Sequence, residues 1–505
     1  MSERKEKIAR NITLLLFGLI SILLMFNHSS WRDEGRAWLI AASVNDVLSL
    51  FHALRYEGTP YLWHFLLYLL QKAGVPYTGM FILHFIIIFS AAYIFLKYAP
   101  FKFYQKVIFI FGYFMMFEYN TIARNYALSV LLIFSLAAVY AKRFERPVLY
   151  STFLFFFVNS SSHSMALGIV LAGFYIYESF ALKKTGVKNI LPGLFIMTAG
   201  IGFAYIQLMT PPDLVGWLKD WNFSLAPRHL AQAPHTLVSA FLPVPIPTLH
   251  FWNTRLVCYP VEYRSIIGGP IFLLLVYMLH KKPKMLTLYL LLASALFALF
   301  IFKHGGSTRH HGILFLAFIF VSWISVYYEY PGKNRQQEDL QNNLKRNILT
   351  GILIVQVLAM PVVLNYSLKY DFSGGRKAAQ ILKDNDAFGE STLIFVYPSI
   401  TAEAILAYTS DNIKIYSPEL EELVRYTTLN TKHGSFQSGG TAGIMEKVGA
   451  AVKGKDFKRI ILILNEKPDN EKFNSEYKLL GETGEAIVKD ERFYIFEKSI
   501  EDKYK

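Results

Sequence analysis

The sequence predicts a mainly α-helical, polytopic membrane protein with about eleven transmembrane helices, followed by a small C-terminal α/β domain. Apolar residues make up 53% of the 505 residues and charged residues 17%, against about 25% in a typical soluble domain. Apolar runs long enough to cross a bilayer recur up to residue 366. Together with the single cysteine, Cys258, these features exclude a disordered chain, a disulfide-stapled secreted protein and an ordinary cytosolic enzyme.

The expected spans are the apolar runs near the length of about 20 residues that crosses a hydrocarbon core. The first run follows a charged N-terminal segment and has no small-residue cleavage site after it, so we expect it to remain as a helix. The segment 59–73 is apolar but short, and we expect it to lie in the outer interface. The expected spans are 11–28, 79–97, 105–119, 121–141, 148–162, 164–182, 189–210, 265–280, 284–303, 311–329 and 348–366.

The distribution of Lys and Arg predicts the orientation, because cytoplasmic loops carry an excess of both. With the N-terminus in the cytoplasm, the short inner loops are rich in basic residues, whereas the long outer loops 29–78 and 211–264 are poor in them for their length. The net charge of +14 then reflects topology, and we expect no nucleic-acid partner. We therefore expect a multi-pass cell-membrane protein with a transmembrane domain over 1–366 and an extracytoplasmic domain over 367–505.

The C-terminal domain is expected to be α/β because strand-like apolar runs alternate with helix-like segments. It contains no Gly-rich phosphate loop, and the Ser-Gly-Gly-Arg sequence at 373–376 is better explained as a helix-capping loop. The expected strands are 391–397, 412–416, 459–464 and 493–496, and the expected helices are 378–382, 402–408 and 442–452.

Two adjacent carboxylates, Asp33 and Glu34, follow the first expected span at the start of a helical stretch. Neighbouring positions on a helix point about 100° apart, so one carboxylate can face a cavity while the other caps the helix or binds a cation. We expect this pair to be catalytic, with Asp33 favoured as the base because it is shorter and closer to the span. The alternative is an acid pair that only interacts with the helix dipole.

Glu57 and His64 flank a Gly-Thr-Pro turn that leads into the short segment 59–73. We expect both side chains to face the cavity under the acid pair and to bind substrate. Interfacial anchoring by Tyr61 and Trp63 is the alternative, and it explains the aromatic residues but not Glu57.

Arg124 and His163 lie in two further polar turns on the expected outer side. Ionisable groups beside spanning helices are costly and mark functional sites, so we expect both to contact substrate. For Arg124 the alternative is an ion pair with Glu118 that holds the helical hairpin, and for His163 it is a bare polar turn.

The densest polar loop is 303–312, and we expect its Arg309 and His310 to bind substrate. Arg offers bidentate contacts to phosphate that Lys does not. Contact with lipid headgroups is the alternative. A zinc site at His304, His310 and His311 is less favoured because adjacent histidines rarely share one ion. No cofactor is certain, and a divalent metal ion stays open.

These residues suit one reaction. A phosphate-linked lipid in the outer leaflet needs basic groups at its headgroup, and a hydroxyl acceptor needs a carboxylate to take its proton. Surroundings that are poor in water strengthen both contacts.

The first outer loop resembles that of GT-C membrane glycosyltransferases, in the lineage of protein O-mannosyltransferases and lipid A aminoarabinose transferases. The resemblance rests on the Asp-Glu pair after the first span, a Thr-Pro-Tyr-Leu-Trp helix ending in Gly, Ala123-Arg124 at a later helix start, and the Thr308-Arg-His sequence. It implies a polyprenyl-phosphate sugar donor, Asp33 or Glu34 as the base, and Arg124 and Arg309 on the lipid phosphate.

The function expected from this resemblance is inverting sugar transfer to a hydroxyl of a lipid, glycan or protein acceptor. A transporter or lipid flippase is the main alternative, although that class places ionisable groups near the bilayer midplane, often in repeated halves. An O-antigen ligase or polymerase is a second alternative, but that class does not explain why an acid pair follows the first span.

Overall fold

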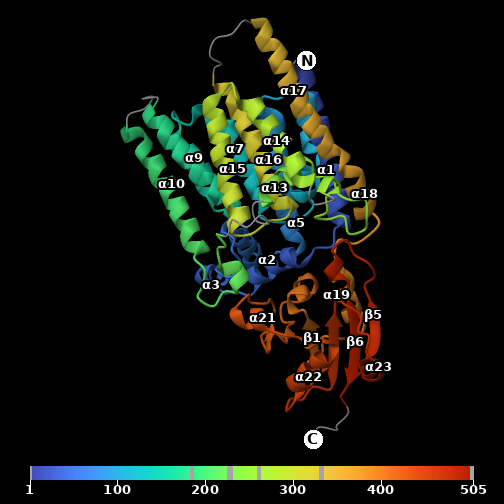
Figure 1. Ribbon diagram of the computed structural model, residues 1–505. Coiled ribbons are helices and arrows are strands. Elements are labelled where there is room, and N and C mark those ends of the chain that lie inside the picture. The colour runs from blue at the N-terminus through green and yellow to red at the C-terminus, as the bar shows by residue number, and fades with distance from the viewer. Residues whose placement is uncertain (1–2, 182–186, 224–230, 259–262, 329–334, 501–505) are drawn as a thin grey trace.

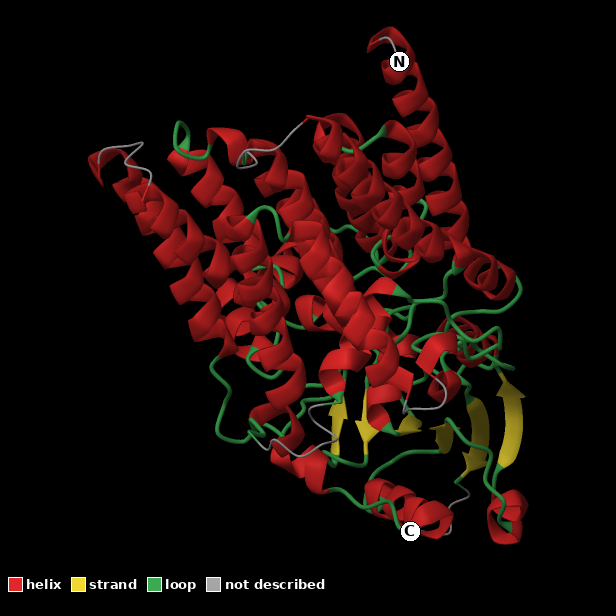
Figure 2. Ribbon diagram, turned by 45° about the horizontal axis from the view of Figure 1, so that its top comes forward, coloured by secondary structure: helices red, strands yellow, loops and turns green. Residues whose placement is uncertain are grey.

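The computed structural model describes residues 3–181, 187–223, 231–258, 263–328 and 335–500. Its helices form a bundle, and a smaller domain that contains all the described strands lies at one end of that bundle (Figure 1). Figure 2 shows the strands gathered at the end opposite the N-terminus. The expected loops 211–264 and 331–347 lie partly outside the described residues.

Seven helices in the described part of the chain are long and apolar enough to cross a membrane, and three shorter apolar helices accompany them. The chain is therefore a mainly helical protein with membrane-spanning character, but the expected count of about eleven spans is not confirmed. The long helices are α1 (Glu3–Asn27), α5 (Thr78–Tyr98), α9 (Ser162–Ala181), α10 (Val187–Leu208), α15 (Pro283–Phe302), α16 (Thr308–Ile324) and α17 with α18 (Arg335–Leu358 and Met360–Ser367). The shorter ones are α7 (Tyr126–Val139), α8 (Pro147–Val158) and α14 (Tyr263–Leu279).

The expected span 105–119 is not one continuous helix. Helix α6 (Phe103–Ile110) ends before Gly112, and a π-helical turn, η1 (Phe114–Glu118), follows. Phe114 packs against Gly312 of α16, where an added Cβ would lie 2.4 Å from the Phe114 ring. Such π-helical turns often occur at functional sites. This one leads directly into the non-helical loop 119–125.

Short helices fill the end of the bundle that faces the sheet. Helix α4 covers part of the segment 59–73 and is about 16 Å long, too short to span. Helix α13, inside the expected outer loop 211–264, packs against α14 and α16. These short helices are α2 (Arg32–Ala42), α3 (Val47–Leu54), α4 (Leu62–Lys72), α11 (Gly216–Lys219) and α13 (Gln232–Phe241), and three 3-10 turns elsewhere are η2 (Tyr140–Lys142), η3 (Leu256–Cys258) and η4 (Ser325–Tyr327).

The C-terminal domain is a six-stranded mixed sheet in the order β3-β2-β1-β4-β6-β5. The central strands β1, β2 and β4 are parallel, and β3, β5 and β6 pair antiparallel. The strands are β1 (Thr392–Tyr397), β2 (Ile415–Ser417), β3 (Glu422–Val424), β4 (Arg459–Leu464), β5 (Lys478–Glu482) and β6 (Tyr494–Ser499).

Alternating side chains of β1 and β4 build one apolar core on each face of the sheet. The first core includes α19 (Gly375–Asp384) and α20 (Glu403–Leu406), and the second includes α22 (Gly440–Val452) and α23 (Glu471–Glu476). The remaining short elements are η5 (Ser399–Ala402), α21 (Thr431–Ser435) and η6 (Lys489–Glu491). Helix α20 packs against α2, so the domain meets the bundle at the first expected outer loop (Figure 1).

Candidate functional site

Asp33 lies between two arginines that come from distant parts of the sequence. Its Oδ2 is 3.2 Å from Nη1 of Arg124 and 3.7 Å from Nη2 of Arg309. The same Arg124 Nη1 also donates to the backbone carbonyl of Asp33 at 2.7 Å. The three side chains are 27%, 19% and 11% exposed, so the group remains reachable from outside. The structure therefore brings together the favoured base and both expected phosphate ligands.

Two tryptophans fix the guanidinium group of Arg309. It lies 5.0 Å from the ring centroid of Trp31 and 5.4 Å from that of Trp252, and the two rings meet edge to face. Cation–π contacts of this kind hold a guanidinium by its face and leave its N–H edge free to bind. The hydroxyl of Tyr119 donates to the carbonyl oxygen of Arg309 at 2.8 Å, which fixes the backbone as well.

Glu34 is fully buried and points away from this group. Its Oε2 lies 2.7 Å from His28 Nε2 and accepts the Trp31 backbone N–H at 3.1 Å, so it caps α2. Its Oε1 accepts the backbone N–H of Ala123 at 2.6 Å. The carboxylate thus joins the first loop to the residue that precedes Arg124, and its contacts are those of a positioning residue.

Arg36, one helical turn after Asp33, joins α2 to the C-terminal domain. Its Nε lies 2.9 Å and 3.0 Å from the two carboxylate oxygens of Glu57, and its Nη1 donates to Glu403 at 2.5 Å. Burial raises the pKa of Glu403 to about 7, and Arg36 opposes that rise. Glu57 therefore lies against Arg36. The expectation that Glu57 contacts substrate stays a prediction.

Arg32, on the other side of Asp33, makes a second junction with the same domain. Its Nη1 lies 2.5 Å from Asp490 Oδ2, and its backbone N–H donates to Glu491 Oε1 at 3.1 Å. Burial raises the pKa of Glu491 to about 8, against the opposing effect of Arg32. Between the two junctions, Gly35 packs so closely that an added Cβ would lie 2.1 Å from the carbonyl oxygen of Glu403.

His64 is buried in α4 beside the arginines of the site. Burial, together with the positive charges of Arg124 and Arg36, lowers the pKa of His64 to about 3, so the imidazole is neutral at physiological pH. Within the described residues its Nδ1 has no hydrogen-bond partner. The turn before α4 is tied to the arginine loop by Asn125, which donates to Thr59 Oγ1 at 3.2 Å.

His163 and His310 stack on each other, with ring centroids 4.9 Å apart. The Nδ1 atom of His310 accepts the Ser307 backbone N–H at 2.9 Å, and its Nε2 lies 2.7 Å from the hydroxyl of Tyr126. An Nδ1 that accepts places the ring proton on Nε2, which then donates to Tyr126. Because His310 follows Arg309 directly, the stacked pair lies beside the arginine group.

Glu118 does not form the hairpin ion pair that was the alternative for Arg124. Its carboxylate accepts from Tyr113 at 2.7 Å and from the Trp252 indole N–H at 3.4 Å, while Arg124 pairs with Asp33. Sequence reasoning missed Trp252, whose only signal is an aromatic residue in a polar loop.

Sequence reasoning also assigned no role to Arg32 or Arg36, although both flank the acid pair in the sequence. A third residue it left unassigned is the buried Arg255, which donates to Ser239 at 2.8 Å and to Thr308 at 3.0 Å.

Across the described ranges, no group of three or more His, Cys, Asp or Glu side chains is placed to hold a metal ion.

Comparison with known proteins adds no family to this geometry. No protein-family model matches the chain. No curated protein sequence matches it at a significant level. The case for a function therefore rests on the arrangement of Asp33, Arg124 and Arg309 at one end of an apolar helical bundle.

Proposed function

We propose that the protein is a membrane glycosyltransferase that moves a sugar from a polyprenyl-phosphate donor to a hydroxyl group of an acceptor, with inversion at the anomeric carbon. The observation that carries this proposal is the carboxylate of Asp33 held between the guanidinium groups of Arg124 and Arg309. A base beside two phosphate ligands, in a bundle that meets lipid, supplies the groups this transfer requires.

In this mechanism the two arginines bind the phosphate of the lipid donor. The acceptor oxygen forms a bond to the anomeric carbon while the bond from that carbon to the phosphate oxygen breaks. The bonding electron pair leaves with the lipid phosphate, whose new negative charge the guanidinium groups stabilise. The proton of the acceptor hydroxyl passes to a carboxylate oxygen of Asp33. Phosphate is a good leaving group, so no general acid is required.

The ion pairs of Asp33 give the phosphate a second role. A phosphate that engages both guanidinium groups competes with the carboxylate for them, since each arginine has a limited set of N–H donors. Binding of the donor therefore weakens the ion pairs of Asp33 and makes its carboxylate oxygen atoms available to the acceptor proton.

The remaining site residues orient the substrates in this proposal. His64, neutral and buried beside Arg124, offers a hydrogen bond to the sugar or to the acceptor. The stacked His163 and His310 line the side next to Arg309. Glu34 acts as a positioning residue through Ala123, and Glu57 acts through Arg36.

The proposal places the site on the extracytoplasmic face. Helix α2, which carries Asp33, lies at the end of the bundle that meets the C-terminal domain (Figure 1), and Arg124 and Arg309 both contact Asp33. The basic loops predict that the opposite end is cytoplasmic. Single cysteines at the exposed positions 145 and 450, in a Cys258→Ser background, test this. Labelling of position 450 only from the cytoplasmic side would reverse the orientation and remove the proposed reaction from the outer leaflet.

The activity itself is tested with purified protein in lipid nanodiscs and a panel of polyprenyl-phosphate sugars. The expected result is time-dependent release of free polyprenyl phosphate, measured by chromatography, which Asp33→Asn slows by about 10²–10⁴. Movement of intact donor between leaflets without release would instead support the transporter alternative.

A further inference from the structure

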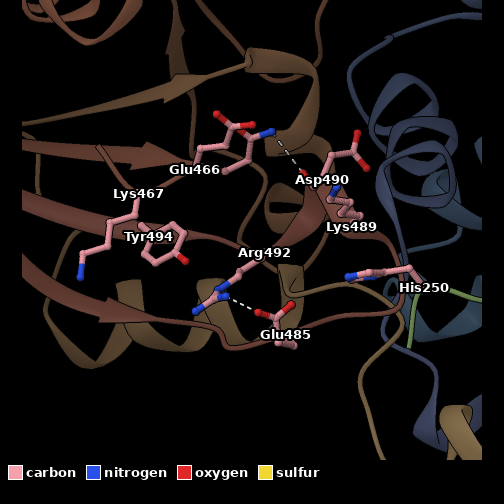
Figure 3. Close-up of a pocket in the computed structure, with 9 residues that line it drawn as sticks. His250, Glu466, Lys467, Glu485, Lys489, Asp490, Arg492 and Tyr494 are labelled. Atoms are coloured by element: carbon pink, nitrogen blue, oxygen red, sulfur yellow. Dashed lines mark hydrogen bonds and ion pairs between the residues drawn. The ribbon is translucent and has the colours of Figure 1, made fainter. Parts of the chain in front are cut away.

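An open cavity of about 740 Å³, lined mainly by charged residues, lies between the C-terminal domain and the loop that precedes η3. His250 contributes the wall on the bundle side, and its Nδ1 donates to the carbonyl oxygen of Ile487 at 3.2 Å. Figure 3 shows the His250 ring pointing toward Arg492 and Glu485, with Lys489 and Asp490 above His250 in this view. The mechanism proposed above uses none of these side chains.

The position of the cavity in the sheet is informative. It is lined by Asn465, Glu466 and Lys467, which directly follow β4, and by Tyr494, the first residue of the neighbouring antiparallel strand β6. The carboxyl end of a parallel strand such as β4 is the end at which open α/β sheets bind ligands.

The charges of the lining favour a neutral ligand. Lys467, Lys489 and Arg492 are matched by Glu466, Glu485 and Asp490. Three of these groups already have partners, because Arg492 pairs with Glu485 and also with Glu482, and Asp490 pairs with Arg32. An anionic ligand would meet as many carboxylates as cations. Closely spaced donors and acceptors of both kinds suit a ligand that carries many hydroxyl groups.

Both sides of the cavity are connected to the residues of the proposed reaction. Asp490, at its edge, accepts from Arg32 at 2.5 Å, and Arg32 is the residue before Asp33. On the bundle side, His250 lies two residues before Trp252, which covers Arg309. Both walls of the cavity thus continue directly into the segments that hold Asp33 and Arg309.

We propose that this cavity binds the acceptor and that the acceptor is a neutral glycan. The role of the glycan as acceptor rests on the proposed transfer reaction. Binding of a glycan in the cavity does not depend on that reaction. A chain of sugars seated on Asn465 and Lys489 extends past Arg32 and presents a terminal hydroxyl to Asp33. The C-terminal domain then selects the acceptor, and the bundle binds the lipid donor.

The test is saturation-transfer NMR on the full chain in nanodiscs, without glycoside detergent. The probes are maltotetraose, cellotetraose, chitotetraose and mannotetraose, with tetragalacturonate as the anionic comparison. We expect signal from at least one neutral probe, and an about tenfold loss of affinity in Asn465→Ala/Lys489→Ala, because two hydrogen-bonding groups are removed. The matched control is Asn474→Ala/Lys478→Ala, two exposed positions of the same domain outside the cavity, which should bind as the parent does.

Three results would overturn the inference: no signal from any neutral probe, equal affinity in the cavity and control variants, or tighter binding of tetragalacturonate than of every neutral probe. The release assay separates this failure from that of the proposed function. Cavity-dependent glycan binding without release of polyprenyl phosphate would leave the glycan site standing and remove the transfer reaction. Release without glycan binding would do the reverse.

Discussion

Asp33→Asn should produce two opposite effects, and this makes it the sharpest test of the mechanism. The amide keeps the shape of the side chain but neither accepts a proton nor carries a charge. Turnover should therefore fall by about 10²–10⁴, the range of a general-base contribution. At the same time, the variant should bind the lipid phosphate more tightly, because Asp33 no longer competes for Arg124 and Arg309.

The size of the second effect follows from the two ion pairs. The Asp33 side chain is 27% exposed, so solvent weakens its pairs at 3.2 Å and 3.7 Å, and each contributes up to about 1 kcal/mol. Removing both should lower the Kd of polyprenyl phosphate by up to about 30-fold. Added salt should shrink this difference, since it screens partly exposed charges.

The assay pairs turnover with equilibrium binding of a fluorescent short-chain polyprenyl phosphate, at low and high salt. Asp213→Asn is the matched control, because Asp213 is an exposed carboxylate that accepts from Tyr56 outside the site. That variant should change neither quantity. Weaker binding of polyprenyl phosphate by Asp33→Asn, or turnover close to that of the parent protein, would refute both the competition and the role of Asp33 as base.

Four further results are expected. Arg124→Ala and Arg309→Ala should each raise the donor KM, and Lys at either position should restore it only in part because the bidentate contact is lost; an unchanged KM and kcat in both Ala variants would exclude them as phosphate ligands. Glu34→Gln should lower the Tm as well as turnover, since the amide nitrogen cannot accept from buried N–H groups; normal Tm with lost turnover would point to catalysis instead. Gly35→Ala should destabilise the domain junction by about 1–3 kcal/mol, seen as faster proteolysis near residue 370, because its Cβ would overlap the Glu403 carbonyl. Glu403 binds its proton more tightly when folded, with its pKa raised from 4.5 to about 7, so stability should fall as pH rises through that interval, and the fall should be smaller in Glu403→Gln.

Much of the architecture could be predicted from the sequence because apolar runs and alternating patterns carry it. Strand β4 occupies the expected residues 459–464, and β1 and β6 begin within one residue of expectation. Strands β3 and β5 were missed, because both lie at the edges of the sheet, expose much of their surface and lack a continuous apolar run. The break in the expected span 105–119 was also missed. Phe114 begins the π-helical turn after the break and packs against Gly312, a contact between distant residues that no local pattern records.

The residues of the candidate site could also be predicted from local sequence, whereas their partners depend on distant segments. The sequence places Asp33, Arg124 and Arg309 in polar segments beside apolar helices, and in the structure a guanidinium nitrogen of each arginine lies within 4 Å of the Asp33 carboxylate. The sequence favoured Asp33 as the base, but it could not identify the partners of Glu34. One of them comes from the distant loop 119–125, where the Ala123 N–H binds the Glu34 carboxylate.

The two junctions of α2 can form only after the C-terminal domain has been synthesised. Arg36 and Glu403 are 367 residues apart in the chain, and Arg32 and Glu491 are 459 apart. At synthesis rates of about 5–20 residues per second, the first loop waits for roughly 20–90 seconds before its last partners leave the ribosome. Until then, nothing from the C-terminal domain holds the segment that carries Asp33. On the proposed function, the segment that carries the base is therefore not fully held in place while the chain is still being inserted.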